Sequence, residues 1–178
     1  MWMEQTLSAS LRPIPRPTFS LPMFEALRPI LNKGGAGHYA TRAQSAERVL
    51  PIAERHLDLF EAYRGAMAGL APGADRERVE ALMPFFRTEM AKISETLLSY
   101  GVAPPSGLGR EPADLGATDA ERLLALADHE RAFGAALRDE VDAVHHQERT
   151  RAILGHNAAA SDRRLDVLRD LTSGLRRG

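Results

Sequence analysis

The sequence predicts an all-α protein: an antiparallel four-helix bundle made of two helical hairpins and preceded by a proline-rich arm. Apolar residues recur at alternating spacings of three and four over four long stretches, which is the pattern of helices packed in a bundle. Prolines and glycines separate most of these stretches, and the two hairpins resemble each other. The chain of 178 residues is long enough for one domain with a sizeable core.

Residues 1–40 form the expected arm. Four prolines between residues 13 and 22 fix their own φ angles and disfavour helix in the residues before them, so this stretch should be extended. A short helix is expected at about residues 22–32. The arm is too apolar for a simple spacer, and we expect it either to fold back on its own bundle or to bind a partner or a second copy. The residues expected to make that contact are Phe19, Leu21, Met23, Phe24, Leu27 and Ile30.

The first hairpin is expected to contain helices at about residues 41–70 and 75–100, with a stop and tight turn between them. Pro51 is expected to kink the first helix or to move its start toward Leu50, and Pro84 to bend the second. The inward-facing positions of these two helices are Val49, Ile52, His56, Leu59, Tyr63, Met67, Leu70, Val79, Leu82, Phe86, Met90, Ile93, Leu97 and Tyr100.

The second hairpin is expected to contain helices at about residues 118–143 and 147–175. Thr118, with Glu121 three residues later, predicts a capping box at the start of the third helix. The loop of residues 102–116 holds three prolines and three glycines and is long enough to cross at the end of the bundle. The inward-facing positions are Leu123, Leu126, Glu130, Phe133, Leu137, Val141, Val144, Ile153, Asn157, Ala160, Leu165, Leu168 and Leu171.

The composition excludes several classes of function. The formal net charge of −1 gives no electrostatic reason to expect nucleic acid or an anionic membrane as a partner. The absence of cysteine excludes disulfides, thiolate catalysis and cysteine-ligated metals. The chain shows no signal-peptide pattern and no apolar stretch approaching eighteen residues, so we expect no transmembrane segment and a cytoplasmic location. No nucleophile triad or phosphate-binding loop is present.

The charge is unevenly distributed along the chain. Residues 1–48 carry six basic and three acidic side chains, residues 49–148 carry ten and eighteen, and residues 149–178 carry seven and three. An acidic body with basic ends could pair with further copies of the same chain. The other interpretation is that these charges are solvated helix faces.

The two hairpins match at the level of pattern. Residues 52–56 lie opposite residues 126–130, and residues 81–82 lie opposite residues 153–154, which gives offsets of 74 and 72. A duplicated hairpin produces a bundle with pseudo-twofold symmetry.

From about residue 46 to residue 171, the chain resembles the ferritin-like superfamily, and within it bacterial four-helix proteins of unknown function. Residues 52–63, 85–90 and 129–133 carry this resemblance. The resemblance implies a ferritin-like fold. In active members, the metal site takes a carboxylate from each of the first and third helices and a Glu-x-x-His pair from each of the other two.

Under this resemblance, the metal positions hold His56, Glu89-x-x-Lys92, Glu130 and Ser161-x-x-Arg164. Both histidine positions therefore carry a cation, which has no lone pair for a metal and repels it. We expect His56, Glu89, Lys92 and Glu130 to form a hydrogen-bonded polar core layer, because unpaired buried polar groups are costly. The alternative is a metal site made of His56, Glu89 and Glu130.

Two further features of the sequence are candidate sites. His145, His146 and Glu148, with His156 further on, are interpreted as a pH-responsive surface patch, because adjacent helical histidines point about 100° apart and cannot share one ion. Residues 171–178 resemble the short tails that address cargo to encapsulin nanocompartments. The simpler interpretation is a helix end with a glycine cap.

The leading hypothesis for function is a non-catalytic structural or interaction protein: a ferritin-like bundle with a degraded metal site that binds protein partners or self-assembles through its arm and helix faces. Under this hypothesis, no residue is assigned a catalytic or cofactor-binding role, and no cofactor is expected. The alternative is an iron-binding, ferroxidase-type protein that uses His56, Glu89 and Glu130, with encapsulin cargo as a related possibility.

Overall fold

The computed structural model describes residues 41–144 and 147–175, all of which belong to the bundle. The expected arm, with its short helix at about residues 22–32 and its six contact residues, lies outside the described residues, as do His145 and His146. Within the described part there are helices, turns and coil and no strand, so the predicted all-α class is confirmed for that part.

The first long helix, α2 (Arg42–Gly69), begins at a capping box. The Thr41 hydroxyl accepts a hydrogen bond from the backbone N–H of Gln44, and the Gln44 side chain accepts one from the backbone N–H of Thr41. Pro51 lies inside this helix, which continues past it. Pro51 is exposed, so the ring itself stands on the solvent side of the helix.

The expected single helix over residues 75–100 is in fact two helices, α3 (Ala74–Glu80) and α4 (Met83–Ser99). Pro84 explains the break. Its ring has no N–H to donate to the residue four positions back, and it would collide with the carbonyl there, so α3 ends at Glu80. Pro84 is instead accommodated in the first turn of α4, where no such hydrogen bond is required.

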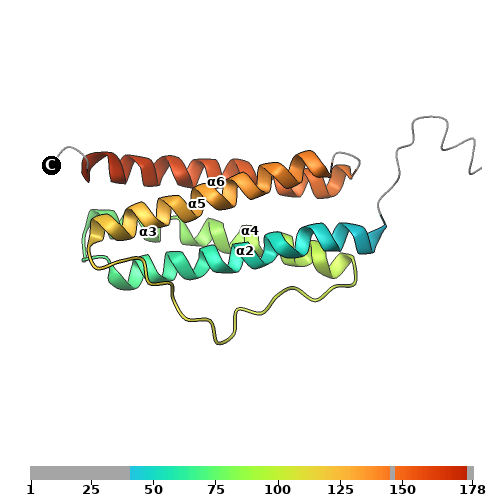
Figure 1. Cartoon of the computed structure of the whole chain (residues 1–178), viewed down its shortest axis with the longest axis horizontal. Helices are drawn as coiled ribbons and strands as arrows, with labels where there is room; N and C mark the ends of the chain where they lie inside the picture. Colours follow the sequence, from blue (N-terminus) through green and yellow to red (C-terminus); the bar gives the residue numbers. More distant parts are fainter. Residues whose placement is uncertain (1–40, 145–146, 176–178) are drawn as a thin grey trace, which may run out of the picture. The chain divides into compact units, whose positions relative to one another are not determined.

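The connection from α4 to α5 runs back along the side of the bundle, and our expectation of a crossing at the bundle end was wrong (Figure 1). The backbone N–H of Ala113 donates to the carbonyl of Glu61 at 3.1 Å, and Arg110 pairs with Asp58. Both partners belong to α2. A Cβ atom added at Gly65 would collide with the carbonyl oxygen of Ala113, so a glycine in α2 is what lets this connection approach.

The second hairpin consists of α5 (Asp119–Ala143) and α6 (Glu148–Leu175). The predicted capping box of Thr118 and Glu121 is confirmed at the start of α5. The helices α2, α4, α5 and α6 lie side by side (Figure 1), and each neighbouring pair among them is antiparallel because the long connection returns the chain to its starting end. The fold is therefore the predicted four-helix bundle.

The core runs along the centre of the bundle and takes side chains from all four long helices. Its largest fully buried apolar members are Tyr63, Phe86, Leu59, Ile93, Leu97, Leu123, Leu126, Leu137, Leu154 and Leu168. The approach of α4 to α6 is sparser than the pairing of α5 with α6, which is extensive. No helix in the described ranges is long and apolar enough to cross a membrane.

Candidate functional site

A polar layer interrupts the apolar core near its middle, and every long helix contributes to it. Its members are Tyr63 from α2, Glu89 from α4, Glu130 from α5, and Ser161 and Arg164 from α6. All five side chains are buried. Buried polar groups are tolerated only when they are hydrogen-bonded, so the bonding of each member decides what the layer can do.

Glu130 is fully buried, with 0% of its surface exposed, and it accepts four side-chain hydrogen bonds. One carboxylate oxygen accepts from the Ser161 hydroxyl at 2.6 Å and from Nη2 of Arg164 at 3.0 Å. The other oxygen accepts from the Tyr63 hydroxyl at 2.7 Å and from Nε of Arg164 at 3.1 Å. A carboxylate has about four lone-pair sites, so Glu130 is saturated by its protein neighbours.

Arg164 joins the two buried carboxylates of the layer. Its Nε and Nη2 grip Glu130 in the two-pronged geometry typical of arginine and carboxylate, and its Nη1 donates to Glu89. The guanidinium carbon also lies 4.9 Å from the ring centroid of Phe86, which is within cation–π range. One cation therefore connects α4, α5 and α6.

The pKa values of the layer follow from burial and from these charges. Burial alone would lower the pKa of Arg164, but the charges of Glu130 and Glu89 outweigh it and raise that pKa above its ordinary value. The pKa of Tyr63 is also raised, first by burial and then by the negative charge of Glu130. Arg164 is therefore charged and Tyr63 is a neutral hydrogen-bond donor.

His56 lies beside this layer without joining its hydrogen bonds. It is 1% exposed, and neither ring nitrogen has a hydrogen-bond partner among the described residues. Its ring packs edge-on against Phe86, with centroids 4.5 Å apart, and at a tilt against Phe133 at 4.7 Å. Burial, aided by the charge of Arg164, lowers its pKa from 6.5 to about 3, so His56 is a neutral core side chain.

Lys92 does not occupy the place in the layer that we expected. It is exposed, and its Nζ lies 3.3 Å from Nε2 of His156 on α6. Arg164 supplies the buried cation instead. The physical reason is that a guanidinium is weakly hydrated and can bond two carboxylates at once, whereas an ammonium group keeps its water and remains at the surface.

The repeat in the sequence identifies Arg164 as the counterpart of Lys92, but the predicted polar layer does not include it. The offset of 72 between the hairpins placed Ser161 and Arg164 opposite Glu89 and Lys92, and both α6 residues are members of the layer. Tyr63 is predicted on the inward face of the first helix. Nothing in the sequence indicates that its hydroxyl donates a hydrogen bond to Glu130.

The residues of this layer do not fit a metal centre. In the described ranges, no group of three or more histidine, aspartate or glutamate side chains is arranged to hold a metal ion. The lone pairs of Glu130 are used by protein donors, and Arg164 offers none of its own.

The C-terminal segment is helical as far as it is described. The final helix α6 extends to Leu175, and residues 176–178 lie outside the described residues. The helix includes most of residues 171–178, the segment that resembles the targeting tails of encapsulin cargo. A role of this segment in targeting stays a prediction.

The comparisons with known proteins agree with this architecture. No protein-family model matches the sequence, and no curated protein matches it. The solved structure of a point mutant of Mycobacterium smegmatis Dps1 is similar, with a TM-score of 0.64 and 14% sequence identity, over 74% of this chain and 96% of the Dps1 chain. At that identity the likeness shows the fold alone: the chain has a ferritin-like four-helix bundle fold.

Proposed function

We propose that the protein is a non-catalytic ferritin-like bundle that acts by binding a protein partner or further copies of itself. In this proposal, Arg164 stabilises the centre of the bundle in place of a metal ion. The supporting observation is that the guanidinium of Arg164 bonds both carboxylates of the buried layer, Glu89 and Glu130. Because the buried polar side chains bond one another, the surface of the bundle is the region that we expect to carry the function.

The charge of the layer supports this interpretation. Two buried carboxylates need compensating positive charge, and in an active ferritin-like site that charge would come from metal ions. Here Arg164 provides one positive charge and three hydrogen bonds to the two carboxylates. A cation entering the layer would have to displace the guanidinium, which makes two of the four side-chain hydrogen bonds to Glu130, and the hydroxyl donors Tyr63 and Ser161, which make the other two.

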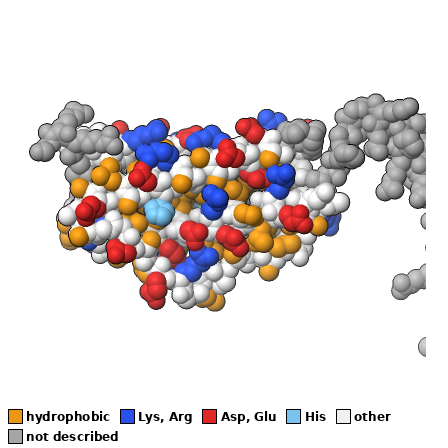
Figure 2. Space-filling view, in the orientation of Figure 1, with side chains coloured by type: hydrophobic (Ala, Val, Ile, Leu, Met, Phe, Trp, Pro, Cys, Tyr) orange, Lys and Arg blue, Asp and Glu red, His pale blue; other side chains and the backbone are white. Residues whose placement is uncertain are grey.

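The surface of the bundle supports the interaction role. Large apolar side chains stand exposed on α4 and on the connection after it, among them Phe85, Leu98 and Leu108. Figure 2 shows acidic and basic side chains interspersed with apolar ones on one face of the bundle. The strongly acidic middle of the chain and its basic ends provide opposite charges for contacts between copies.

Metal analysis of tag-free protein tests the proposal. After incubation with Fe(II) and desalting, far less than one iron per chain is expected. Near-stoichiometric iron would sink the proposal. In that case the rival iron-binding function makes its own prediction: Glu130→Ala should abolish iron uptake while far-UV circular dichroism shows that the bundle remains helical.

Light scattering on the full chain tests the interaction role separately. A mass above that of one chain is expected, and Phe24→Ser with Leu27→Ser should lower it if the arm makes the contact. A chain that is monomeric at all concentrations and retains no partner on purification would contradict this part of the proposal.

A further inference from the structure

A groove of about 480 Å³ lies between α4 and α6, on the side where these two helices approach each other sparsely. Its walls are residues spaced three and four apart on each helix, so one face of α4 opposes one face of α6. The volume lies within the range of about 300–1,000 Å³ that is typical of pockets for small molecules. The groove reaches the polar layer, because Glu89 and Arg164 are among its lining residues.

The groove is polarised along its length. Lys92 and His156 meet at one end, with Nζ and Nε2 3.3 Å apart. Leu82 and Phe85 belong to the other end of the α4 wall, because ten residues of helix separate Leu82 from Lys92, a rise of about 15 Å. Val167 lines the groove from α6, eleven residues after His156, and α6 runs antiparallel to α4. The Lys92 end is therefore cationic and the far end holds Leu82, Phe85 and Val167, while Arg163 lies between them on α6, about 10 Å along the axis from His156.

The charges of the groove favour an anion. Its lining includes three cationic side chains, Lys92, Arg163 and Arg164, and one carboxylate, Glu89. Glu89 is already bonded to Arg164. Within the described residues, no carboxylate lies within ion-pair distance of Lys92 or Arg163. Two exposed cations at a partly apolar groove complement one negative group.

The apolar end of the groove is complementary to an apolar group on the ligand. Phe85 is 70% exposed, which is unusual for a phenylalanine, and it stands at the wall of the groove. The other large exposed apolar residues of the described part lie elsewhere, with Leu98 more than three turns further along α4 and Leu108 on the connecting segment. The apolar surface is therefore local, and it suits a single chain or ring more than a long partner helix.

We propose that this groove binds a small amphipathic anion: a carboxylate joined to an apolar chain about ten carbons long. The carboxylate lies against Lys92, and the chain runs toward Phe85 and Leu82. This binding function goes beyond the proposed interaction role.

Calorimetric titration of the full chain with decanoate tests the proposal, with decylammonium as the ligand of equal tail and opposite charge. Decanoate should bind at one site per chain, and decylammonium at least tenfold more weakly. Lys92→Gln is expected to weaken decanoate binding about fivefold, as loss of one charge pair near the surface would. Thr88→Trp, at an exposed position on the groove wall, should block the tail and abolish binding.

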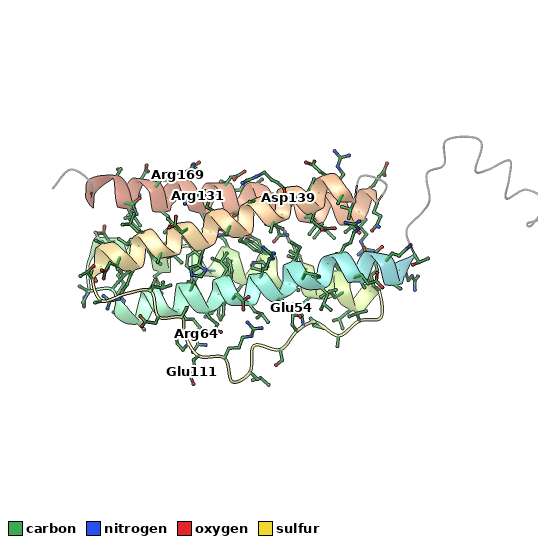
Figure 3. All side chains as sticks on the ribbon, in the orientation of Figure 1. Glu54, Arg64, Glu111, Arg131, Asp139 and Arg169 are labelled. Carbon is green, nitrogen blue, oxygen red and sulfur yellow. The ribbon has the colours of Figure 1, made fainter. Side chains whose placement is uncertain are left out.

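Two control variants locate the site. Arg169→Gln removes an exposed cation from α6 outside the groove (Figure 3), and Arg76→Gln removes one from a second basic hollow lined by α2, α3 and the start of α4. Both should bind decanoate as the unmodified chain does. Equal binding of decylammonium, unchanged binding in both Lys92→Gln and Thr88→Trp, or loss of binding in Arg76→Gln would each overturn the proposal. So would a full chain that takes up no decanoate.

Discussion

Arg164→Ala is the change that tests most directly whether one guanidinium stabilises the two carboxylates at the centre of the bundle. The substitution removes three hydrogen bonds, two to Glu130 and one to Glu89. The side chains of those carboxylates are 0% and 7% exposed, so solvent cannot replace the lost partner. Breaking a buried ion pair by removing one partner costs about 3–5 kcal/mol, and we expect a loss of that size in the free energy of unfolding.

Arg169→Ala is the matched control. Arg169 lies on the same helix and pairs with Asp166 at 3.2 Å, but the two side chains are 58% and 73% exposed. Exposed pairs contribute about 0–1 kcal/mol, so this variant should be nearly as stable as the unmodified chain. Both free energies can be measured by urea unfolding followed by circular dichroism.

The cause of the loss can be isolated with a third variant. Replacing Arg164 with methionine and Glu89 and Glu130 with leucine removes all three charges together. Swapping a buried ionic cluster for apolar residues is often neutral or stabilising by about 1–4 kcal/mol, so this triple variant should recover most of what Arg164→Ala loses. If Arg164→Ala costs no more than Arg169→Ala, the reasoning about uncompensated buried charge is refuted.

Two further predictions concern the long connection and the buried histidine. Gly65→Ala should destabilise the protein, because the new methyl group meets the backbone of Ala113. Gly155→Ala has no atom within 4 Å of the added Cβ and should stabilise α6 by about 0.5–1 kcal/mol. Thermal unfolding of the pair checks this, and equal shifts of the same sign would contradict it. The pKa of His56 falls from 6.5 to about 3 on folding, through burial and then the charge of Arg164, so the unfolded chain binds more protons in that range and stability must fall as the pH falls. Between about pH 7.5 and pH 5, His56 alone should remove roughly 2 kcal/mol, and His56→Leu should flatten this part of the curve. An unchanged slope in His56→Leu would show that other groups cause the pH dependence.

The parts of the fold that depend on local chemistry could be predicted from the sequence. The capping box at Thr118 needs two side chains three residues apart, and both are visible in the sequence. The sequence predicts only a bend at Pro84, whereas the structure has a break between two helices before it. Pro51, by contrast, lies inside one unbroken helix. Whether a proline bends or ends a helix depends on the surrounding packing, which the local sequence does not contain.

The path of the connection between the hairpins depended on contacts that are distant in sequence. The carbonyl of Glu61 receives the N–H of Ala113, more than fifty residues later, and the space for it exists because residue 65 is glycine. A glycine inside a helical pattern signals only that something approaches closely. The identity of the approaching segment becomes known when the two helices and the connection are placed together.

The candidate site, like the fold, was predictable from the sequence only in part. The repeat between the hairpins placed polar residues at matching positions. It was enough to predict Glu89 and Glu130 in the polar layer, but it did not assign Ser161 and Arg164 to the layer, and it wrongly included His56 and Lys92. It could not decide which cation turns inward. Lys92 and Arg164 occupy matching positions in the two hairpins, yet one is exposed and the other is almost fully buried. The choice follows from geometry across helices, since a single guanidinium can reach carboxylates on two other helices.

This asymmetry also explains how the bundle keeps one helix register. Apolar side chains of similar size can slide past one another at small cost, whereas four hydrogen bonds on one carboxylate exist in only one alignment. Glu130 takes its donors from α2 and α6, and Arg164 carries the connection on to α4. A shift of one helix by a single turn would leave a buried charge without a partner, at a cost of several kcal/mol. The polar layer can therefore fix the alignment of four helices, a role that metal ligands could otherwise serve, and the outer faces of α4 and α6 remain free to differ and to bind.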